Sequence, residues 1–312
     1  MTTPLPRGAT GGASSAGTAY TLLAALGFAA VSTLTALALA EGLSLPVVLM
    51  WRYVLAATVM VTFVVLRRYP RMRWSEAVRF VVIGGGGQAL FVGLALSSLR
   101  YVSNATLAFL FYTYPAWVTI VQALRGAERI TRRRALALGM SFAGIAVIVL
   151  APVLAASSKA ASVSFNLPAW QGVALALAAA LTYGIYIPTM QTLQKQHPVP
   201  VTSAYAKLGS AVCFLLLAVA DRSITASLTP AAWTAIAALA LVSTVLPSVL
   251  FLMGLMRLGP VRTAIISTVE PFLTALLAAI VLRQAITAPV LVGGAMIVGA
   301  VLLLRAPRTR VA

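Results

Sequence analysis

Apolar residues gather along this chain in ten long runs, and short polar or glycine-containing breaks separate the runs. Each run is close to the roughly 20 residues that a helix needs to cross the hydrocarbon core of a bilayer. Because an amide that faces lipid must be paired within its own segment, we expect every run to be a helix. The runs lie near residues 20–40, 45–66, 76–98, 102–123, 133–151, 169–190, 199–219, 231–252, 261–282 and 287–304.

Composition supports an all-α integral membrane protein. Of the 312 residues, 61% are hydrophobic and only 9% are charged, whereas soluble domains carry about 25% charged residues. The formal net charge of +18 is concentrated in short clusters between the apolar runs. Such clusters set membrane topology and can contact anionic lipid headgroups, so we expect lipids and no nucleic acid as partners.

The basic clusters alternate from one side of the membrane to the other. Positively charged loops stay in the cytoplasm, which predicts a multi-pass protein of a bacterial plasma membrane with both termini inside. The cytoplasmic segments would then contain Arg7, Arg67, Arg68, Arg71, Arg73, Arg125, Arg129, Arg132, Arg133, Arg134, Lys195, Arg257, Arg262, Arg305, Arg308 and Arg310. The outer loops would hold only Arg100, Lys159, Arg222 and Arg283.

An internal repeat relates the fourth and ninth runs. The interval from Leu99 to Pro115 is the same as that from Leu255 to Pro271. The match continues beyond the prolines to a further pair, Glu128 and Gln284. Each half therefore holds five spans, and an odd number inserts the second copy upside down. Inverted repeats can adopt two mirror-related conformations, which favours a transporter with its substrate site between the halves.

The repeat also sets the domain boundaries. We expect a disordered tail over 1–19, a first five-helix repeat over 20–152, a linker over 153–168, a second five-helix repeat over 169–305 and a basic cytoplasmic tail over 306–312. The first segment is rich in Gly, Ser, Thr and Ala, which is typical of disordered tails. Since both halves lie in one chain, a monomer is sufficient, and a dimer is also compatible.

Two blocks of sequence carry short motifs that occur in corresponding parts of the two halves. The first has Ala-Leu at 95–96 and Tyr-Val-Ser-Asn-Ala at 101–105, followed by Pro115 and Glu128. The second has Leu-Gly-Pro at 258–260 followed by Glu270-Pro271. Together these motifs resemble the ten-span, EamA-type branch of the drug/metabolite transporter superfamily. The second block departs from that pattern in having Gln284 where such families often have Glu. The resemblance implies export of amino acids, related metabolites or cationic drugs, with the aromatic and neutral amino-acid exporters as a similar subgroup.

Glu270 is the only carboxylate well inside a predicted span. An ionised carboxylate there costs several kcal/mol, so it must be neutral, paired or facing a wet cavity. One interpretation is a proton-coupling site or a partner for a substrate amine. The alternative is a hydrogen-bonded structural residue beside a kink at Pro271.

Tyrosines are the other strong candidates for substrate contacts. A tyrosine offers an apolar, cation-attracting face and a hydroxyl, which suits an amphipathic solute with an amine. A structural alternative is the belt of aromatic residues at the membrane interface. The predicted substrate contacts are Tyr112, Tyr114, Tyr183, Tyr186, Glu270, Asn104, Gln88 and Lys207.

Two basic residues, Arg52 and Lys207, lie within the second and seventh spans, which are repeat counterparts. The default interpretation is that each extends its aliphatic stem toward a membrane surface. The sharper hypothesis is that they hold a substrate carboxylate or a gate. Ser203 and Ser210 share a helix face with Lys207, which favours the sharper hypothesis for the lysine.

Helix breakers occur inside several runs. Pro115, Pro271, Pro188 and Pro247 are candidate hinges because proline removes a helical hydrogen bond, although each could serve packing alone. The glycines at 84–87 lack a following Gly-Lys-Ser/Thr, so they favour close helix packing or a flexible third helix over a phosphate loop.

The remaining chemistry argues against an enzyme. His197 is the only histidine and Cys213 the only cysteine, so we expect no metal or cofactor site and no nucleophile with its base. A channel stays open as another class. The sequence therefore predicts export of small amine-bearing metabolites, foremost neutral or aromatic amino acids, by alternating access, with efflux of lipophilic cationic drugs as the alternative.

Overall fold

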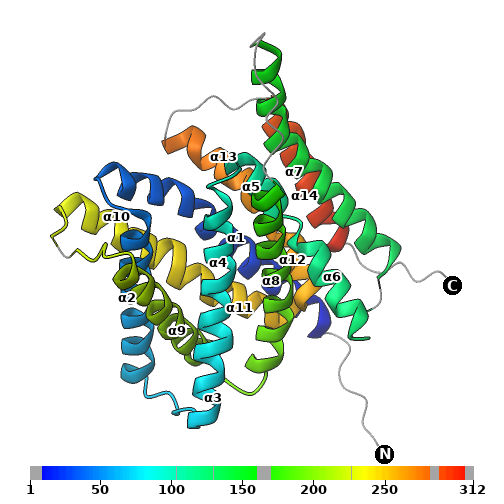
Figure 1. The fold of residues 1–312 in the computed structure, drawn as a ribbon. Helices are drawn as coiled ribbons and strands as arrows, with labels where there is room; N and C mark the ends of the chain where they lie inside the picture. The colour runs from blue at the N-terminus through cyan, green and yellow to red at the C-terminus, as the bar shows by residue number, and fades with distance from the viewer. Residues whose placement is uncertain are drawn as a thin grey trace, which may run out of the picture.

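The computed structural model describes residues 9–102, 104–128, 130–159, 170–225, 227–281 and 288–305. All regular structure in these ranges is helical (Figure 1). Eight helical segments of the described chain are long and apolar enough to cross a membrane, and 288–304 is a shorter apolar helix. Together with α7 (Arg132–Lys159) they correspond to the ten predicted spans, so the predicted all-α class is confirmed.

Six spans are single helices and four are interrupted. The single ones are α1 (Ala9–Ala40), α2 (Leu45–Leu66), α7, α8 (Trp170–Gln194), α9 (Val199–Ala220) and α14 (Ala288–Arg305). The third and eighth spans each contain a π-helical turn. They consist of α3 (Trp74–Arg79), η1 (Phe80–Gly86) and α4 (Gly87–Ser98), and of α10 (Pro230–Ala240), η2 (Leu241–Val245) and α11 (Leu246–Leu258). The fourth and ninth spans are α5 (Asn104–Phe111) with α6 (Tyr114–Leu124), and α12 (Pro260–Ser267) with α13 (Glu270–Val281).

The first helix begins earlier than the sequence predicts. Residues 9–19 belong to α1, so the expectation of a disordered tail is corrected there, while residues 1–8 lie outside the described ranges. A Cβ on Gly17 would come within 2.8 Å of Leu258 Cγ. The small residues that lower the hydropathy of this segment thus let α1 approach α11 closely. At the linker, α7 continues to Lys159, and residues 160–169 and 306–312 lie outside the described chain.

Proline restarts the fourth and ninth helices at matching places. Pro115 and Pro271 each occupy the second position of a new helix, α6 and α13, where a missing N–H costs no helical bond. The helical turn before each break is closed by a hydrogen bond that spans three residues instead of four. The amides of Thr113 and Val269 each donate to the carbonyl three residues back at 3.2 Å. Two helices are therefore broken at the predicted prolines.

The other two candidate hinges differ in their surroundings. Pro247 lies in the first turn of α11, directly after η2. Pro188 lies inside α8, which continues through it as one helix. Their role as hinges stays a prediction.

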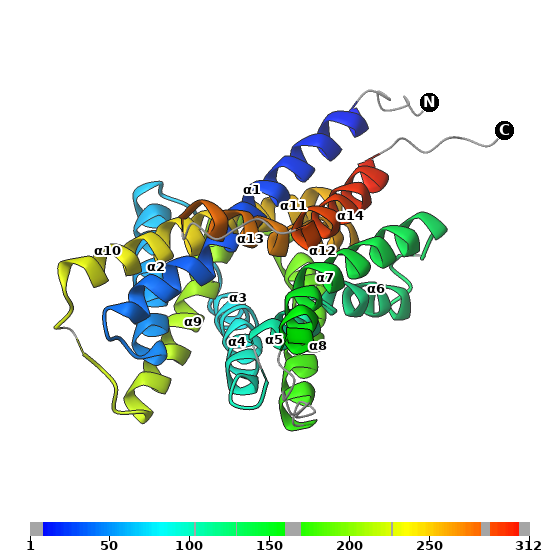
Figure 2. The same cartoon turned by 90° about the horizontal axis from the view of Figure 1, so that it is seen from above.

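Helix packing has the symmetry that an inverted duplication requires. The second span packs on the seventh (α2 on α9) and the fifth on the tenth (α7 on α14). The first packs on the eighth (α1 on α11), and its counterpart, the sixth, packs on the third (α8 on α4). Figures 1 and 2 show the α7–α14 and α2–α9 pairs side by side in both views. Each contact has a partner with the halves exchanged, as two copies of opposite orientation demand.

The third span crosses α9 closely at the four glycines of residues 84–87. A Cβ on Gly85 would overlap the Gly209 backbone of α9, and a Cβ on Gly84 would lie 3.0 Å from Ala206 Cβ. Gly86 has nothing within 4 Å of such a Cβ. Close packing, one of the two interpretations of this run, is therefore confirmed for the third and seventh spans.

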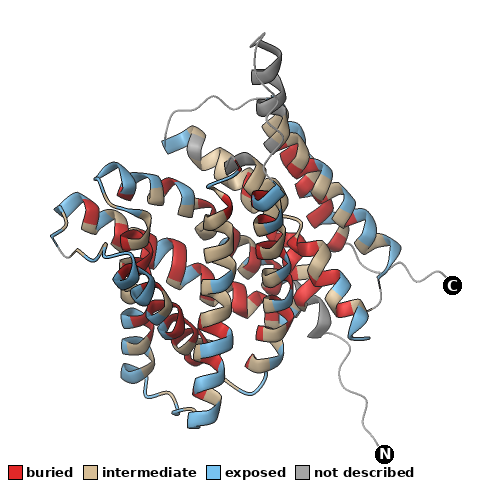
Figure 3. Ribbon diagram, in the orientation of Figure 1, coloured by how far each residue is buried: buried red, intermediate tan, exposed pale blue. Residues whose placement is uncertain are grey.

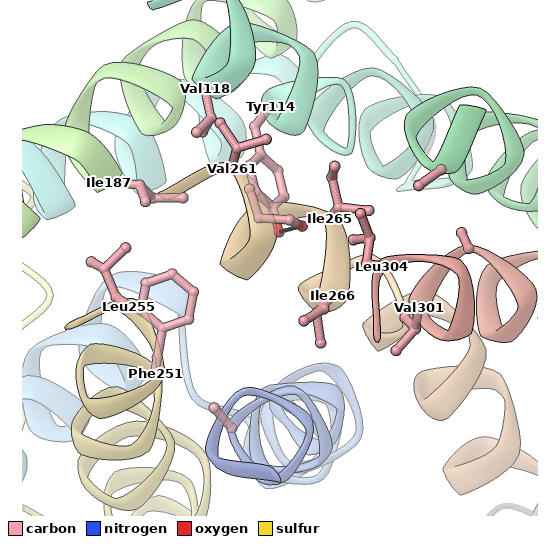
Figure 4. Close-up of a cluster of buried hydrophobic side chains, with 14 of the residues drawn as sticks. Tyr114, Val118, Ile187, Phe251, Leu255, Val261, Ile265, Ile266, Val301 and Leu304 are labelled. Carbon is pink, nitrogen blue, oxygen red and sulfur yellow. Dashed lines mark hydrogen bonds between the residues drawn. The ribbon is translucent and has the colours of Figure 1, made fainter. Parts of the chain in front are cut away.

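Buried residues gather toward the centre of the helix bundle (Figure 3). Apolar side chains also cover the outer faces. Leu66 and Leu124, for example, keep 75% and 83% of their surface exposed. The largest buried cluster joins α6, α8, α11, α12 and α14 around Tyr114, Leu255 and Ile265 (Figure 4). An apolar exterior around a packed interior is the arrangement expected for a protein surrounded by lipid.

Candidate functional site

Six aromatic rings meet where α4, the α5–α6 break and α8 come together. We call this group the aromatic wall; it comprises Phe91, Phe111, Tyr112, Tyr114, Tyr183 and Tyr186. Tyr183 is its hub, with its ring centroid 4.6 Å from that of Phe91, 4.7 Å from Tyr114 and 5.6 Å from Phe111. The structure therefore brings together the four tyrosines that the sequence singles out.

Five rings of the aromatic wall are only half-buried, and Tyr114 is the exception at 2% exposure. The hydroxyl of Tyr114 donates to the Ala264 carbonyl of α12 at 3.4 Å. In Figure 4 its ring points from α6 into the space beside Val261 and Ile265. Tyr114 thus joins the two repeats, and the other five rings offer the accessible surface.

Glu270 lies against this wall from the opposite repeat. It is the first residue of α13, where free backbone N–H groups and the helix dipole stabilise a negative charge. The Tyr112 hydroxyl lies within hydrogen-bonding reach of the Glu270 carboxylate, and the carboxylate also acts electrostatically on Tyr114. The Glu270 side chain is half-buried. An acid from the ninth span and tyrosines from the fourth therefore form one site.

A second polar group surrounds Lys207 on α9. Its Nζ donates to Gln88 Oε1 at 2.9 Å, and Ser210 Oγ donates to the same oxygen at 3.1 Å. Lys207 is 3% exposed, so it does not extend toward a membrane surface. The predicted contacts Gln88 and Lys207 are therefore neighbours, and the default interpretation of Lys207 is wrong.

Arg52 on α2 is also turned inward, with 9% exposure. Its Nε donates to Thr244 Oγ1 at 2.6 Å and its Nη2 to the Ser243 carbonyl at 3.4 Å, both in η2. The Tyr53 ring centroid lies 5.2 Å from Arg52 Cζ and 5.6 Å from Lys207 Nζ. We call Arg52, Lys207 and Tyr53 the basic cluster.

Some site residues were not predicted and one cannot be placed. The sequence did not predict a role for Phe91, Phe111 or Tyr53. Phe91 could have been found, because it follows Gln88 by three residues and so shares its helix face. The Asn104 side chain lies outside the described residues. For Phe111 and Tyr53 the signal is weaker, because an aromatic residue in an apolar run most often serves packing.

Glu128, the acid of the family pattern, lies at the predicted cytoplasmic end. Its Oε2 is 2.5 Å from Arg134 Nη1. Its Oε1 lies 3.2 Å from where a Cβ on Gly259 would be, at the junction of the eighth and ninth spans. Glu128 therefore touches the other repeat, and its counterpart Gln284 lies outside the described chain.

Known proteins share this architecture. The EamA-like transporter family matches residues 15–150 and again residues 170–306, once in each repeat. A relative from Archaeoglobus fulgidus, described as an uncharacterized transporter, is 26% identical over 215 residues, which is 69% of this chain and 72% of the relative. A solved crystal structure superposes with a TM-score of 0.77 at 21% identity and covers 93% of this chain and 96% of that one. At that identity the likeness shows the fold alone.

Proposed function

The chain belongs to the EamA-like transporter family, and from that premise we propose that it exports small amine-bearing metabolites, foremost neutral and aromatic amino acids, by alternating access. One observation carries the proposal, namely that Glu270 of the second repeat lies against the aromatic wall of the first. A solute between the two repeats would touch both.

The chemistry of this site suits an ammonium group on an apolar body. The Glu270 carboxylate can accept hydrogen bonds from an amine, and hydrogen bonds to charged groups are worth about 1.5–3 kcal/mol. The half-buried rings of Phe91, Tyr183 and Tyr186 add apolar surface and cation–π attraction of about 0.5–2 kcal/mol. An aromatic amino acid presents both features to such a site.

Alternating access is supported by the paired helix breaks. The turns at 112–113 and 268–269 lie at equivalent positions of the two repeats and adjoin the site. A change of angle at one break, mirrored at the other, would open the site to one side and close it to the other. Pro115 and Pro271 are the proposed main hinges of this movement, and Pro247 and Pro188 are further candidate hinges.

The direction of transport follows from the proposed topology. By the positive-inside rule, the basic clusters between the spans favour a topology with both termini in the cytoplasm of a bacterial plasma membrane. An exporter would then load from the side where Glu128 and Arg134 pair. Neither a cofactor nor a second chain is needed for the proposed cycle, because both halves of the site belong to one chain.

Efflux of lipophilic cations is the second candidate. An aromatic wall with one carboxylate is also how proteins recognise quaternary ammonium groups. The two candidates differ in the rest of the solute, since an amino acid brings a carboxylate and a lipophilic cation does not.

Efflux from proteoliposomes tests the proposal. Vesicles are preloaded with labelled Phe, Trp, Thr or Ala, or with tetraphenylphosphonium, and flux is followed with and without an imposed pH gradient. We expect saturable flux of at least one amino acid. Acceleration by the gradient that is lost in Glu270→Gln would assign Glu270 a proton-coupling role. Flux of tetraphenylphosphonium without any amino acid would replace the proposal by its alternative, and non-saturable flux would indicate a channel.

A further inference from the structure

The basic cluster places two cationic side chains inside a membrane protein with little compensation. Arg52 is always protonated, and it lies close enough to Lys207 for their like charges to repel. Since one Tyr53 ring lies within 5.6 Å of both charged groups, their separation cannot exceed the sum of the two distances to its centroid. The two cationic groups therefore lie beside the same tyrosine ring and concentrate positive charge there.

Only neutral oxygens contact these two side chains. Arg52 donates to the Thr244 hydroxyl and the Ser243 carbonyl, and Lys207 donates to the Gln88 amide oxygen. Within the described ranges, the ion pairs are Glu128 with Arg134 and Glu76 with His197, and neither involves the basic cluster. A buried charge without a counterion is costly and is usually retained for function.

Buried hydroxyls close by add unused hydrogen-bonding capacity. Ser243, whose carbonyl accepts from Arg52, is 0% exposed, and its Oγ has no hydrogen-bond partner. Ser203, one turn before Lys207 on α9, is 1% exposed and likewise has an unpartnered Oγ. Unpartnered buried hydroxyls are uncommon in folded proteins and call for an explanation.

The contacts of the basic cluster follow the internal repeat. Arg52 reaches from the second span to the eighth, and Lys207 reaches from the seventh to the third, which is the same contact with the repeats exchanged. The acceptors Gln88 and Thr244 are separated by the same interval as Pro115 and Pro271. The two packed helices α2 and α9 therefore each direct a cation at the middle of a span of the opposite repeat.

The basic cluster also adjoins the aromatic wall. Gln88, which accepts from Lys207, lies one helical turn before Phe91 of the aromatic wall on α4. A Cβ on Gly87, next to Gln88, would lie 3.1 Å from the Tyr186 ring. A solute held at the aromatic wall thus has a centre of positive charge within its surroundings.

We propose that Arg52 and Lys207 form a carboxylate-binding site between the two repeats, so that the transported solute carries an organic carboxylate. This inference rests on the proposed function and narrows it, because it favours amino acids over lipophilic cations. Arg52 supplies a planar donor suited to two carboxylate oxygens, and Lys207 supplies a point charge.

A series of ligands tests the site in the unmodified protein. The full chain in nanodiscs is titrated calorimetrically with Phe, phenylalaninamide, 2-phenylethylamine and 3-phenylpropionate, which differ in the carboxylate or the amine. We expect the amide and the phenylethylamine to bind at least about tenfold more weakly than Phe, since each lacks a charged hydrogen-bond partner. Equal affinity for Phe and its amide would overturn the inference.

Variants locate the effect. Lys207→Gln and Arg52→Gln should bind Phe and its amide equally, whereas Lys195→Gln, at an exposed position after α8, should discriminate as the wild type does. Charge-retaining Arg52→Lys and Lys207→Arg proteins separate a folding defect from a lost site. Persistent discrimination in both glutamine variants would refute the assignment to these residues.

Failure of the proposed function gives a different pattern. Binding of 3-phenylpropionate that depends on Arg52 and Lys207, with no binding or transport of amino acids, would support the carboxylate site and reject amino-acid export. Transport of phenylalaninamide at the rate of Phe would reject the carboxylate site and leave the amine site of Glu270 standing.

Discussion

The fourth and ninth spans have the same backbone plan and different side chains. Both break two residues before a helix whose second residue is proline. At the first break stand Tyr112, Thr113 and Tyr114, and at the second stand Thr268, Val269 and Glu270. The two repeats therefore share the geometry of the helix breaks but differ in the side chains placed there. The fourth span has aromatic rings at its break, and the ninth has one acid.

This divergence explains why the two repeats contribute different side chains to the candidate site. A strictly symmetric transporter would present matching groups from each half. Here the fourth span contributes Tyr112 and Tyr114, and the ninth contributes Glu270 together with Thr268, whose hydroxyl donates to Ser141 at 3.1 Å. The basic cluster, by contrast, keeps a cation in each half.

Removing the acid should have the largest effect on transport. Glu270→Gln keeps the size of the side chain and abolishes its charge, so amine-bearing solutes lose a charged partner worth about 1.5–3 kcal/mol. We expect the kcat/KM of counterflow to fall by about tenfold to a hundredfold. Glu41→Gln, at an exposed position after α1, is the matched control. Equal kinetics in the two variants would show that the acid of the ninth span has no part in recognition.

Opening the aromatic wall should have the next largest effect. Tyr183→Ala removes the hub ring, and aromatic contacts of this kind contribute about 0.5–1.5 kcal/mol. We therefore expect KM for aromatic solutes to rise by about twofold to tenfold, with Tyr183→Phe close to the wild type because the ring stays. A Phe variant as impaired as the Ala variant would attribute the role to the hydroxyl instead.

A methyl group added where the third span crosses α9 should lower the stability of the protein. Gly85→Ala forces a methyl into the Gly209 backbone, and overpacking of this kind costs about 1–3 kcal/mol. Gly86→Ala, one residue further, has open space around its Cβ and should not lower the midpoint of thermal unfolding. Equal midpoints for these two variants in detergent would contradict the close crossing of the third and seventh spans.

The smallest effect should come from the prolines of the two breaks. At the second position of a helix, proline removes no helical bond, so Pro115→Ala and Pro271→Ala should leave stability within about 1 kcal/mol. If the breaks act as paired hinges, both substitutions should slow transport by a similar factor of about two without changing affinity. Slowing in only one variant would mean that the two breaks are mechanically different.

The sequence predicted the span count and the duplication because both leave local marks: long apolar runs and a repeated interval between leucine and proline. It misjudged the start of α1, where small residues around Gly17 pack closely against α11 despite their low hydropathy. An outward extension was its default interpretation for Arg52 and Lys207, because the facing oxygens of Thr244 and Gln88 come from distant spans. Only for the lysine did neighbouring serines on the same helix face favour an inward position. The π-helical turns η1 and η2 were not predicted from the sequence.

Within the site, sequence reasoning found residues whose type is unusual in a membrane. Glu270 and the tyrosines stood out in this way, whereas Phe91 and Tyr53 resembled ordinary apolar packing. Their role depends on ring distances across α2, α4, α8 and α9, which only the folded arrangement supplies.

Photolabelling would test most directly whether a solute lies between Glu270 and the aromatic wall. Proteoliposomes are irradiated with p-benzoylphenylalanine, with and without excess Phe, and adducts are located by mass spectrometry. Adducts on the peptides that contain Phe91 and Tyr183, suppressed by Phe and absent in Glu270→Gln, are the predicted result. Adducts that Phe does not suppress, or that fall only on lipid-facing peptides, would contradict the account.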